Sequence, residues 1–157
     1  MQIKTKLAAA SLSLSLAGIA FIQGWEGTET SAYLDSVRVP TICTGSTRGV
    51  YLGQTATLAE CEERLVQDTS YAGEAIQRCV QQKLTQGQYD ALVSLSFNIG
   101  GGAICRSTLV RKLNQGDCRG AGREFLRWDY AGGKKLRGLT KRRAAESNLF
   151  LKDCYGN

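Results

Sequence analysis

The sequence predicts an α+β fold in which an apolar segment and a small β-hairpin region precede a mainly helical lobe. Residues 31–50 carry few helix signals and include the only proline, Pro40. Within them, SAYLDS (31–36) and VPTICTG (39–45) are typical of two short strands joined by a turn. After residue 57 the apolar side chains follow helical spacing. The 157 residues contain no linker or internal repeat, so we expect one domain.

Local start and stop signals predict the helices in order. Thr57 and Glu60 form a capping box that opens a helix running to about Val80. A second box, Thr85–Gln88, begins a buried helical segment that the glycines at 100–102 end. Three further helices are expected. The first runs from Ser107 through Leu113 and ends near Gly116. The second is capped by Asp117, contains Phe125, Leu126 and Trp128, and stops at Gly132 and Gly133, and the third is opened by Thr140 and runs towards Cys154.

The N-terminal segment has three interpretations. Lys4 and Lys6 precede an uncharged stretch, 7–25, whose strongly apolar part is 7–22. As a helix this apolar part would be about 24 Å long, whereas the hydrocarbon core of a membrane is roughly 30 Å thick. It could be a signal peptide cleaved after Ala20, an uncleaved signal anchor weakened by small residues and serines, or a buried first helix. We favour the signal anchor.

The composition narrows the possible chemistry. The chain has no histidine, which excludes Ser-His-Asp and Cys-His catalysis and removes the commonest zinc ligand. No CxxC pair is present, so we expect no metal site. The net charge of +6 favours an anionic partner, such as nucleic acid, an acidic membrane surface or a bacterial wall polymer. Because the chain carries no nucleic-acid-binding motif, we do not expect nucleic acid as the partner.

The six cysteines form an even, scattered set, which favours disulfides made in an oxidising compartment over free thiols. Six cysteines allow fifteen pairings. The order of the expected helices favours a scheme in which each pair joins elements that can pack on one another. The scheme pairs Cys79 with Cys105, Cys118 with Cys154, and Cys43 with Cys61.

Glu26, Asp35 and Thr41 form the spacing E-x8-D-x5-T. Cleavage of a glycosidic bond needs an acid and a second group that handles water or the sugar cation, and Glu26 and Asp35 are the first candidates for these groups. Three further segments follow in order: QYDALVSLSFNIG (88–100), STLVRKLNQGD (107–117) and RWDYAGGKKLRGLTKRRAAE (127–146). Together, over residues 19–154, they resemble the phage-type lysozymes, glycoside hydrolase family 24.

The resemblance implies a lysozyme-like fold with a catalytic cleft between the β-region and the helical lobe. It implies that Glu26 is the general acid, that Asp35 with Thr41 positions and activates the attacking water, and that the reaction inverts the anomeric carbon. Arg142 matches the arginine that pairs with the catalytic glutamate. No metal or organic cofactor is implied. The positions that match residues lining the sugar cleft are Phe97, Asn98 and Ser107.

The same resemblance implies an endolysin that hydrolyses the β-1,4 bonds between N-acetylmuramic acid and N-acetylglucosamine in bacterial peptidoglycan and so lyses the host. The alternative is a catalytically inactive peptidoglycan-binding module. Residues 1–25 would be a signal-arrest-release segment that merges into the first helix of a catalytic domain, 19–157. We expect a monomer that is exported to the host periplasm, is tethered at first to the inner membrane through residues 7–25, and is then released. The residues expected to weaken insertion are Ser11, Ser13, Ser15 and Gly18.

Overall fold

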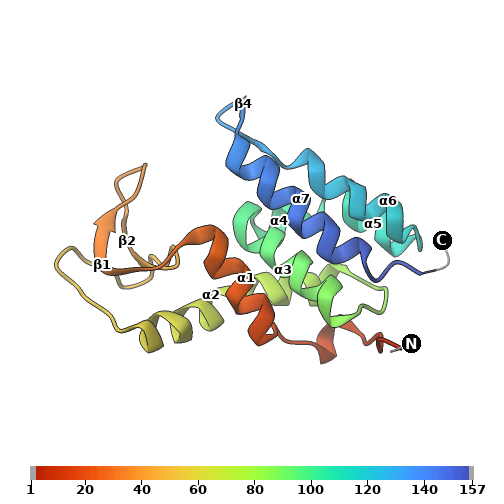
Figure 1. Ribbon diagram of the computed structural model, residues 1–157, viewed down its shortest axis with the longest axis horizontal. Helices are drawn as coiled ribbons and strands as arrows, with labels where there is room; N and C mark the ends of the chain where they lie inside the picture. The colour runs from red at the N-terminus through yellow and green to blue at the C-terminus, as the bar shows by residue number, and fades with distance from the viewer. Residues whose placement is uncertain (1–2, 156–157) are drawn as a thin grey trace.

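The computed structural model describes residues 3–155 and confirms the α+β architecture that the sequence predicts (Figure 1). A β-hairpin stands to one side of a lobe built of helices (Figure 1). On that lobe Lys4, near the start of the described residues, pairs with Asp153, near their end, at 2.6 Å. The elements in chain order are η1 (Ala9–Ser11), α1 (Leu16–Glu26), β1 (Glu29–Leu34), β2 (Pro40–Cys43), α2 (Leu58–Cys79), α3 (Gln86–Ile99), α4 (Gly101–Cys105), α5 (Thr108–Asn114), α6 (Cys118–Glu124), η2 (Phe125–Arg127), β3 (Tyr130–Ala131), β4 (Lys134–Lys135) and α7 (Arg137–Leu151).

The first hairpin consists of the two strands expected from the sequence. β1 and β2 pair antiparallel, with Tyr33 opposite Thr41. Ile42 and Cys43 of β2 pack with Cys61 of α2 in a small apolar cluster. This cluster attaches the hairpin to the long helix α2, separately from the main core of the helical lobe.

Helix α3 lies at the centre of the helical lobe and packs against α1, α2 and α7. All nine residues from Gln88 to Ser96 are buried, so its side chains meet neighbouring elements on every side. The capping boxes expected at Thr57 and Thr85 are present, and α2 and α3 each begin one residue after them. Gly100, with a φ of 95°, ends α3 as expected.

One expectation about the glycines is refined and another is wrong. Gly100 alone takes the positive φ that ends α3, and Gly101 and Gly102 begin a further turn, α4. The helix capped by Asp117 ends at Glu124 and continues only as the short η2. It does not run on to Gly132, which lies in a second hairpin.

The second hairpin, β3–β4, also displaces the start of the last helix. Gly132 and Gly133 take φ values of 58° and 76°, and two successive positive φ values are what a tight two-residue turn of this kind requires. The hydroxyl of Thr140 donates to the carboxylate of Asp129 at 2.9 Å, at the base of the hairpin. Thr140 is therefore not a helix cap, and α7 begins three residues earlier, at Arg137.

The apolar N-terminal segment is folded onto the helical lobe as several short pieces. Leu7 and Leu84 exchange two backbone hydrogen bonds, of 2.8 and 2.7 Å, and η1 and α1 follow with a break between them. Ile19 and Ile22 of α1 are buried in the main core. Among residues 3–155, no helix is long and apolar enough to cross a membrane.

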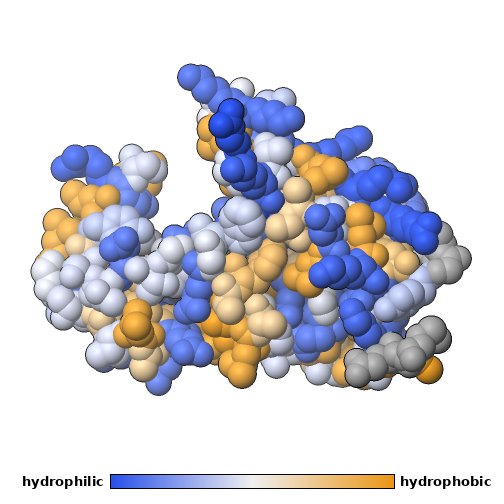
Figure 2. Space-filling model, in the orientation of Figure 1, coloured by the Kyte–Doolittle hydropathy of each residue, from blue (hydrophilic) through white to orange (hydrophobic). Residues whose placement is uncertain are grey.

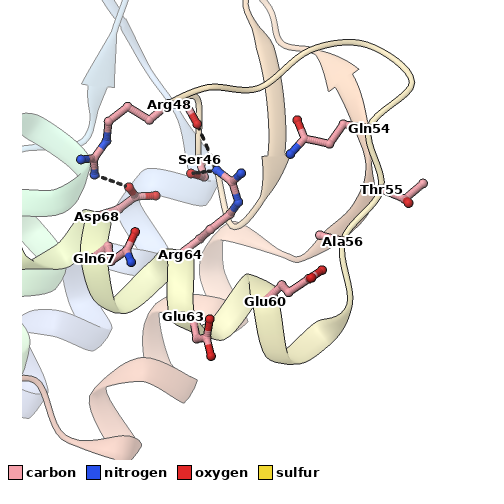
Figure 3. A pocket seen from close by; sticks show the side chains of 10 residues that line it. All are labelled: Ser46, Arg48, Gln54, Thr55, Ala56, Glu60, Glu63, Arg64, Gln67 and Asp68. Carbon is pink, nitrogen blue, oxygen red and sulfur yellow. Dashed lines mark hydrogen bonds and ion pairs between the residues drawn. The ribbon is translucent and has the colours of Figure 1, made fainter.

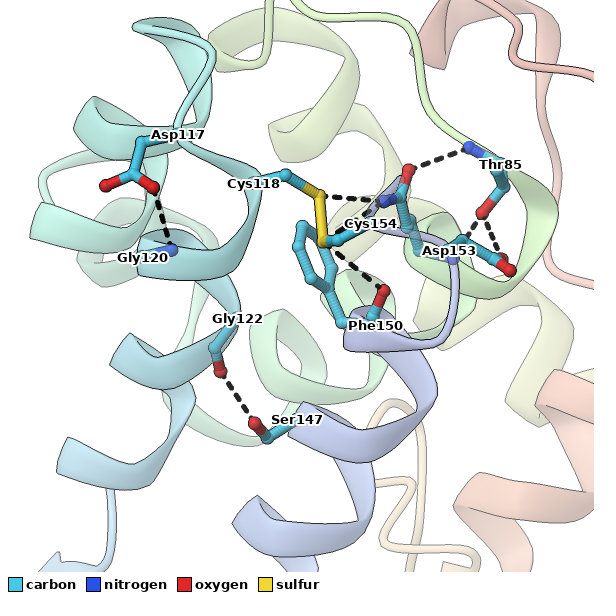
Figure 4. The surroundings of a disulfide bond; sticks show 10 residues. Thr85, Asp117, Cys118, Gly120, Gly122, Ser147, Phe150, Asp153 and Cys154 are labelled. Carbon is cyan, nitrogen blue, oxygen red and sulfur yellow. Dashed lines mark hydrogen bonds between the residues drawn. A yellow bond between two sulfur atoms is a disulfide. The ribbon is translucent and has the colours of Figure 1, made fainter. Parts of the chain in front are cut away.

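The predicted disulfide pairing is confirmed. The third disulfide joins the first residue of α6 to the chain that follows α7, as Figure 4 shows. Close to it, Thr85 at the start of α3 donates to the carboxylate of Asp153 at 2.5 Å, so the ends of α3 and α7 are held together. The three pairs are Cys43–Cys61, Cys79–Cys105 and Cys118–Cys154.

Candidate active site

A cleft separates the β1–β2 hairpin from the helical lobe, and Figure 2 shows it as a hollow between two raised parts of the surface. The predicted catalytic residues all come from the stretch that leads from one side of this cleft to the other. Glu26 is the last residue of α1, Asp35 directly follows β1, and Thr41 lies in β2. Gly27, with a φ of 73°, ends α1 and directs the chain into the hairpin.

Glu26 is paired with Arg142 of α7. The Glu26 side chain is 25% exposed, whereas that of Arg142 is 5% exposed. Arg142 Nη1 donates to Glu26 Oε1, which joins residues that are 116 positions apart in the chain. The structure thus places the predicted arginine against the predicted acid, with the carboxyl group still open to solvent on one side.

Arg142 is itself held by a buried polar network. Its Nε donates to Oε1 of Glu146 at 3.0 Å, and its Nη2 donates to the backbone carbonyl of Ser94 at 3.2 Å. Ser94 Oγ donates to the same Glu146 oxygen at 2.7 Å, and Arg143 Nη2 donates to it at 3.2 Å. Because all of these side chains are buried, water does not compete with the contacts that fix the guanidinium of Arg142.

Burial and neighbouring charges have opposite effects on the pKa values of Glu146 and Arg143. Burial raises the pKa of Glu146, while the Arg143 charge, the Ser94 hydrogen bond and Arg142 oppose that rise. Burial also lowers the pKa of Arg143, and the carboxylate of Glu146 opposes it. Neither Ser94 nor Glu146 stands out in the sequence. The only local sign of their role is the i,i+4 spacing of Arg142 and Glu146, which places the two on one face of a helix.

Asp35 is fixed by the backbone of the hairpin turn. Its Oδ1 accepts hydrogen bonds from the N–H groups of Val37, at 2.9 Å, and Val39, at 2.8 Å. An aspartate that bonds the backbone two residues ahead is typical of tight turns. The same bonds also hold the carboxylate in one orientation.

Thr41 is buried, at 3% exposure, and its hydroxyl donates to the carbonyl of Val39 at 2.9 Å. The hydroxyl proton is thereby committed to the backbone, which leaves the oxygen lone pairs as acceptors. Val39 therefore contacts both residues, because its N–H binds Asp35 and its carbonyl binds Thr41.

The three residues predicted to line the sugar cleft have different surroundings. Phe97 is half-buried and packs against the main core, whereas Asn98 is exposed at the end of α3. Ser107 caps α5, where its Oγ accepts from the N–H of Val110 at 3.2 Å and donates to the carbonyl of Ile104 at 2.6 Å. Ser107 also lines a pocket of about 430 Å³ on the helical lobe.

Another pocket, of about 400 Å³, lies between α2 and the chain that follows β2, as Figure 3 shows. Arg64 donates to Ser46 Oγ at 3.3 Å and to the carbonyl of Arg48 at 3.1 Å, and Arg48 pairs with Asp68 at 3.0 Å. These bonds attach the loop to α2. The lining contains none of the predicted catalytic residues. Within residues 3–155, no group of three His, Cys, Asp or Glu side chains is placed to hold a metal ion.

The chain is similar to phage lysozymes in sequence. The family model described as phage lysozyme matches residues 23–146. The SAR-endolysin of Enterobacteria phage P21 is 39% identical over 145 residues, which cover 92% of this chain and 88% of that protein. The endolysin of Salmonella phage P22 is also 39% identical and covers 89% of this chain and 99% of its own length.

The fold agrees with these relatives. The crystal structure of a P22 lysozyme mutant superposes with a TM-score of 0.83 at 39% identity, over 89% of this chain and 99% of that one. The active form of P1 phage endolysin Lyz, 21% identical, covers 91% of this chain and 87% of its own with a TM-score of 0.82. The secreted inactive form of the same enzyme, over 88% of this chain and 96% of its own, reaches a TM-score of only 0.59. By its sequence match and its fold, the chain belongs to the phage lysozyme family.

Proposed function

We propose that this phage endolysin, a muramidase that hydrolyses bacterial peptidoglycan and lyses the host cell wall, uses Glu26 as its general acid. The observation that carries this proposal is the pairing of Glu26, at the end of α1, with an arginine that a buried network holds in place. The carboxyl stays partly open to solvent at the cleft. Glu26 can therefore reach the oxygen of a bound glycosidic link while its position is fixed.

In this mechanism, residues of the β1–β2 hairpin position and activate the attacking water. Asp35 takes a proton from a water molecule that also donates to Thr41 Oγ1, and the water oxygen bonds to the anomeric carbon of N-acetylmuramic acid. As this bond forms, the bond from that carbon to the N-acetylglucosamine oxygen breaks, and Glu26 protonates the leaving oxygen. Attack from the face opposite the leaving group inverts the anomeric carbon, and the water between the carboxyl groups requires a separation of about 6.5–9.5 Å.

Substrate contacts are assigned to the helical side of the cleft. Asn98 is exposed, so its side-chain amide can donate a hydrogen bond to, or accept one from, an N-acetyl or hydroxyl group of a sugar. Phe97 is half-buried, so part of its side chain remains available for contact with a sugar ring. The hydroxyl of Ser107 is engaged as a helix cap, so we place it at the border of the site. Because one chain supplies every group named, a monomer is sufficient for the reaction.

The test of the mechanism is lysis by variants that fold normally. Glu26→Gln keeps the size of the side chain but cannot donate the proton, so peptidoglycan clearing in a zymogram should fall by about 10²- to 10⁴-fold. Asp35→Ala and Thr41→Ala should each reduce clearing severely. Glu29→Gln, the same change at an exposed strand position nearby, is the matched control and should clear the gel normally.

Two outcomes would count against this assignment. Normal clearing by Glu26→Gln, at equal amounts of folded protein, would mean that another group is the acid. If the unchanged chain binds purified sacculi and does not clear them, the protein is a peptidoglycan-binding module without activity.

We also propose that residues 7–25 first act as a signal anchor and later leave the inner membrane, so that the enzyme starts tethered in the host periplasm and is then released. The relative from phage P21 is named a SAR-endolysin and is similar over 92% of this chain. The buried positions of Ile19 and Ile22 support the proposal, because α1 can pack into the core only when it has left the bilayer. Glu26 would then reach Arg142 only after release.

The structure indicates which positions can test release without disturbing the docked segment. Ser11, Ala17 and Ala20 are exposed, so leucine at all three raises the affinity for the bilayer and leaves the packed positions unchanged. This variant should stay in the membrane fraction and delay lysis. Replacing Ala17 and Ala20 with serine is the opposite change. That variant should leave the membrane fraction sooner and cause lysis earlier. Equal partitioning of the two variants, or an exported protein that begins at Phe21, would contradict the proposal.

A further inference from the structure

The start of α1 is held by a carboxylate from another helix. Ser15 is the N-cap of α1, and its Oγ accepts a hydrogen bond from the N–H of Gly18 at 2.9 Å. Asp90 of α3, which is 5% exposed, accepts from the Ser15 N–H at 3.1 Å and from the Ser15 hydroxyl. Gln86 Nε2 donates at 2.9 Å to Asp90 Oδ1, which is the oxygen that accepts from the Ser15 N–H. The cap of α1 is thus itself bound by a buried anion.

Gly18 makes this contact possible. A Cβ atom at position 18 would lie 2.7 Å from Cγ of Asp90 and 2.7 Å from Cδ1 of Leu14, which are distances that real side chains do not adopt. Only glycine therefore allows the first turn of α1 to lie directly on the Asp90 carboxylate. A negative charge at this place also interacts favourably with the N-terminal end of the helix dipole.

The other end of α1 is tied to the same face of α3. Glu26 pairs with Arg142, and Arg142 donates to the carbonyl of Ser94. Asp90 and Ser94 are four residues apart on α3 and so lie on one face of that helix. α1 has eleven residues, about 16 Å, with no acidic residue in its first turn and no basic residue in its last. So short a helix depends on such ties to fix where its last residue lies.

We infer that Asp90 is a positioning residue for the catalytic acid: by binding the cap of α1 it sets the position along α3 at which α1 docks, and with it the place of Glu26 in the cleft. The inference rests on the proposed role of Glu26. Asp90 does not touch the substrate in this scheme. Its removal should therefore lower the rate of the chemical step and leave binding of the sugar chain nearly unchanged.

The first experiment compares Asp90→Leu and Asp90→Asn in kinetics on soluble, uncross-linked peptidoglycan strands. Leucine removes every acceptor for Ser15, and a shift of Glu26 by about 1 Å should lower kcat about 10- to 100-fold with KM close to the wild-type value. Asparagine keeps one acceptor oxygen for the Ser15 N–H and should retain most of the activity. Hydrogen exchange at Gly18 and Ile19 should become faster in Asp90→Leu.

A matched pair of cap deletions separates positioning from general stability. Ser15→Ala and Thr57→Ala each remove the hydroxyl that caps a helix, but only Ser15 caps the helix that carries Glu26. Both should lower the melting temperature, and only Ser15→Ala should lower kcat. This pair decides the question even if Asp90→Leu does not fold.

The outcomes also separate this inference from the proposed mechanism. If Glu26→Gln is inactive and both Asp90→Leu and Ser15→Ala keep the wild-type kcat, Asp90 does not position the acid. A loss of kcat in Thr57→Ala equal to that in Ser15→Ala would likewise overturn the inference. If Glu26→Gln is active, the assignment of the acid fails first.

Discussion

Replacing Arg142 with methionine removes a buried guanidinium while keeping much of the side-chain volume. At the 3.0 Å between Arg142 Nε and Glu146 Oε1, an effective dielectric constant of about 20 gives roughly 5.5 kcal/mol of attraction, most of which offsets the desolvation of the two groups. Deleting one partner of such a pair costs about 3–5 kcal/mol, because the other charge stays buried. The variant should therefore melt roughly 6–20 °C lower than the wild type.

The same substitution should reduce activity at temperatures where the variant is still folded. Glu26 loses the contact that holds its carboxyl group, so kcat should fall by up to about 100-fold. Lysine at position 142 keeps a charge but cannot reach Glu26, Glu146 and Ser94 together, so it should give intermediate values. Urea unfolding gives the stability, and hydrolysis of soluble peptidoglycan strands gives kcat.

Arg127→Met is the matched control. Arg127 also pairs with a glutamate, Glu124, but its side chain is 74% exposed, so its removal should cost at most about 1 kcal/mol and leave kcat unchanged. If Arg142→Met is as stable as Arg127→Met, the buried network around Arg142 does not stabilise the fold more than an exposed ion pair does. If it is unstable but fully active, Arg142 is structural only.

Three further results are expected. Alanine at both Cys118 and Cys154 should cost about 3.8 kcal/mol in urea unfolding, from the 36-residue separation that the disulfide closes, and an unchanged midpoint would refute this value. Proton NMR during hydrolysis should show the α-anomer of the new reducing end first, and the β-anomer first would mean retention. Burial raises the pKa of Tyr89 above its ordinary 10.0, so its contribution to stability is complete below that pH and is lost as the pH rises through the raised value. Tyr89→Phe should lessen this alkaline loss of stability, and an identical pH profile of the melting temperature would contradict it.

The long helices could be predicted because their boundaries are set by neighbours in the chain. Thr57 with Glu60, and Thr85 with Gln88, make reciprocal side-chain bonds three residues apart, and both are present in the structure. Such interactions form in almost any tertiary context, so a single sequence is sufficient to locate them. The order of these helices also indicated the disulfide pairs.

The region from residue 117 to 140 could not be predicted in the same way. Phe125 and Trp128 continue the helical spacing of apolar residues, yet the helix ends at Glu124. The chain turns back in a hairpin whose base is tied by Thr140 to Asp129. Two consecutive glycines can stop a helix or form a hairpin turn, and only the packing of α7 on the rest of the lobe decides between them.

The sequence by itself narrowed the groups that can carry the chemistry. Without histidine, acid–base catalysis must rest on carboxylates, tyrosines, lysines or cysteines, and the spacing of Glu26, Asp35 and Thr41 predicts two carboxylates and a threonine. Only the tertiary structure decided how they are held. Ser94 lies 48 residues from Arg142, and Asp90 lies 75 residues from Ser15. A polar side chain that is buried against a distant partner looks, in the sequence, the same as one that faces water. The difference arises only when packing removes the water and leaves one partner within reach.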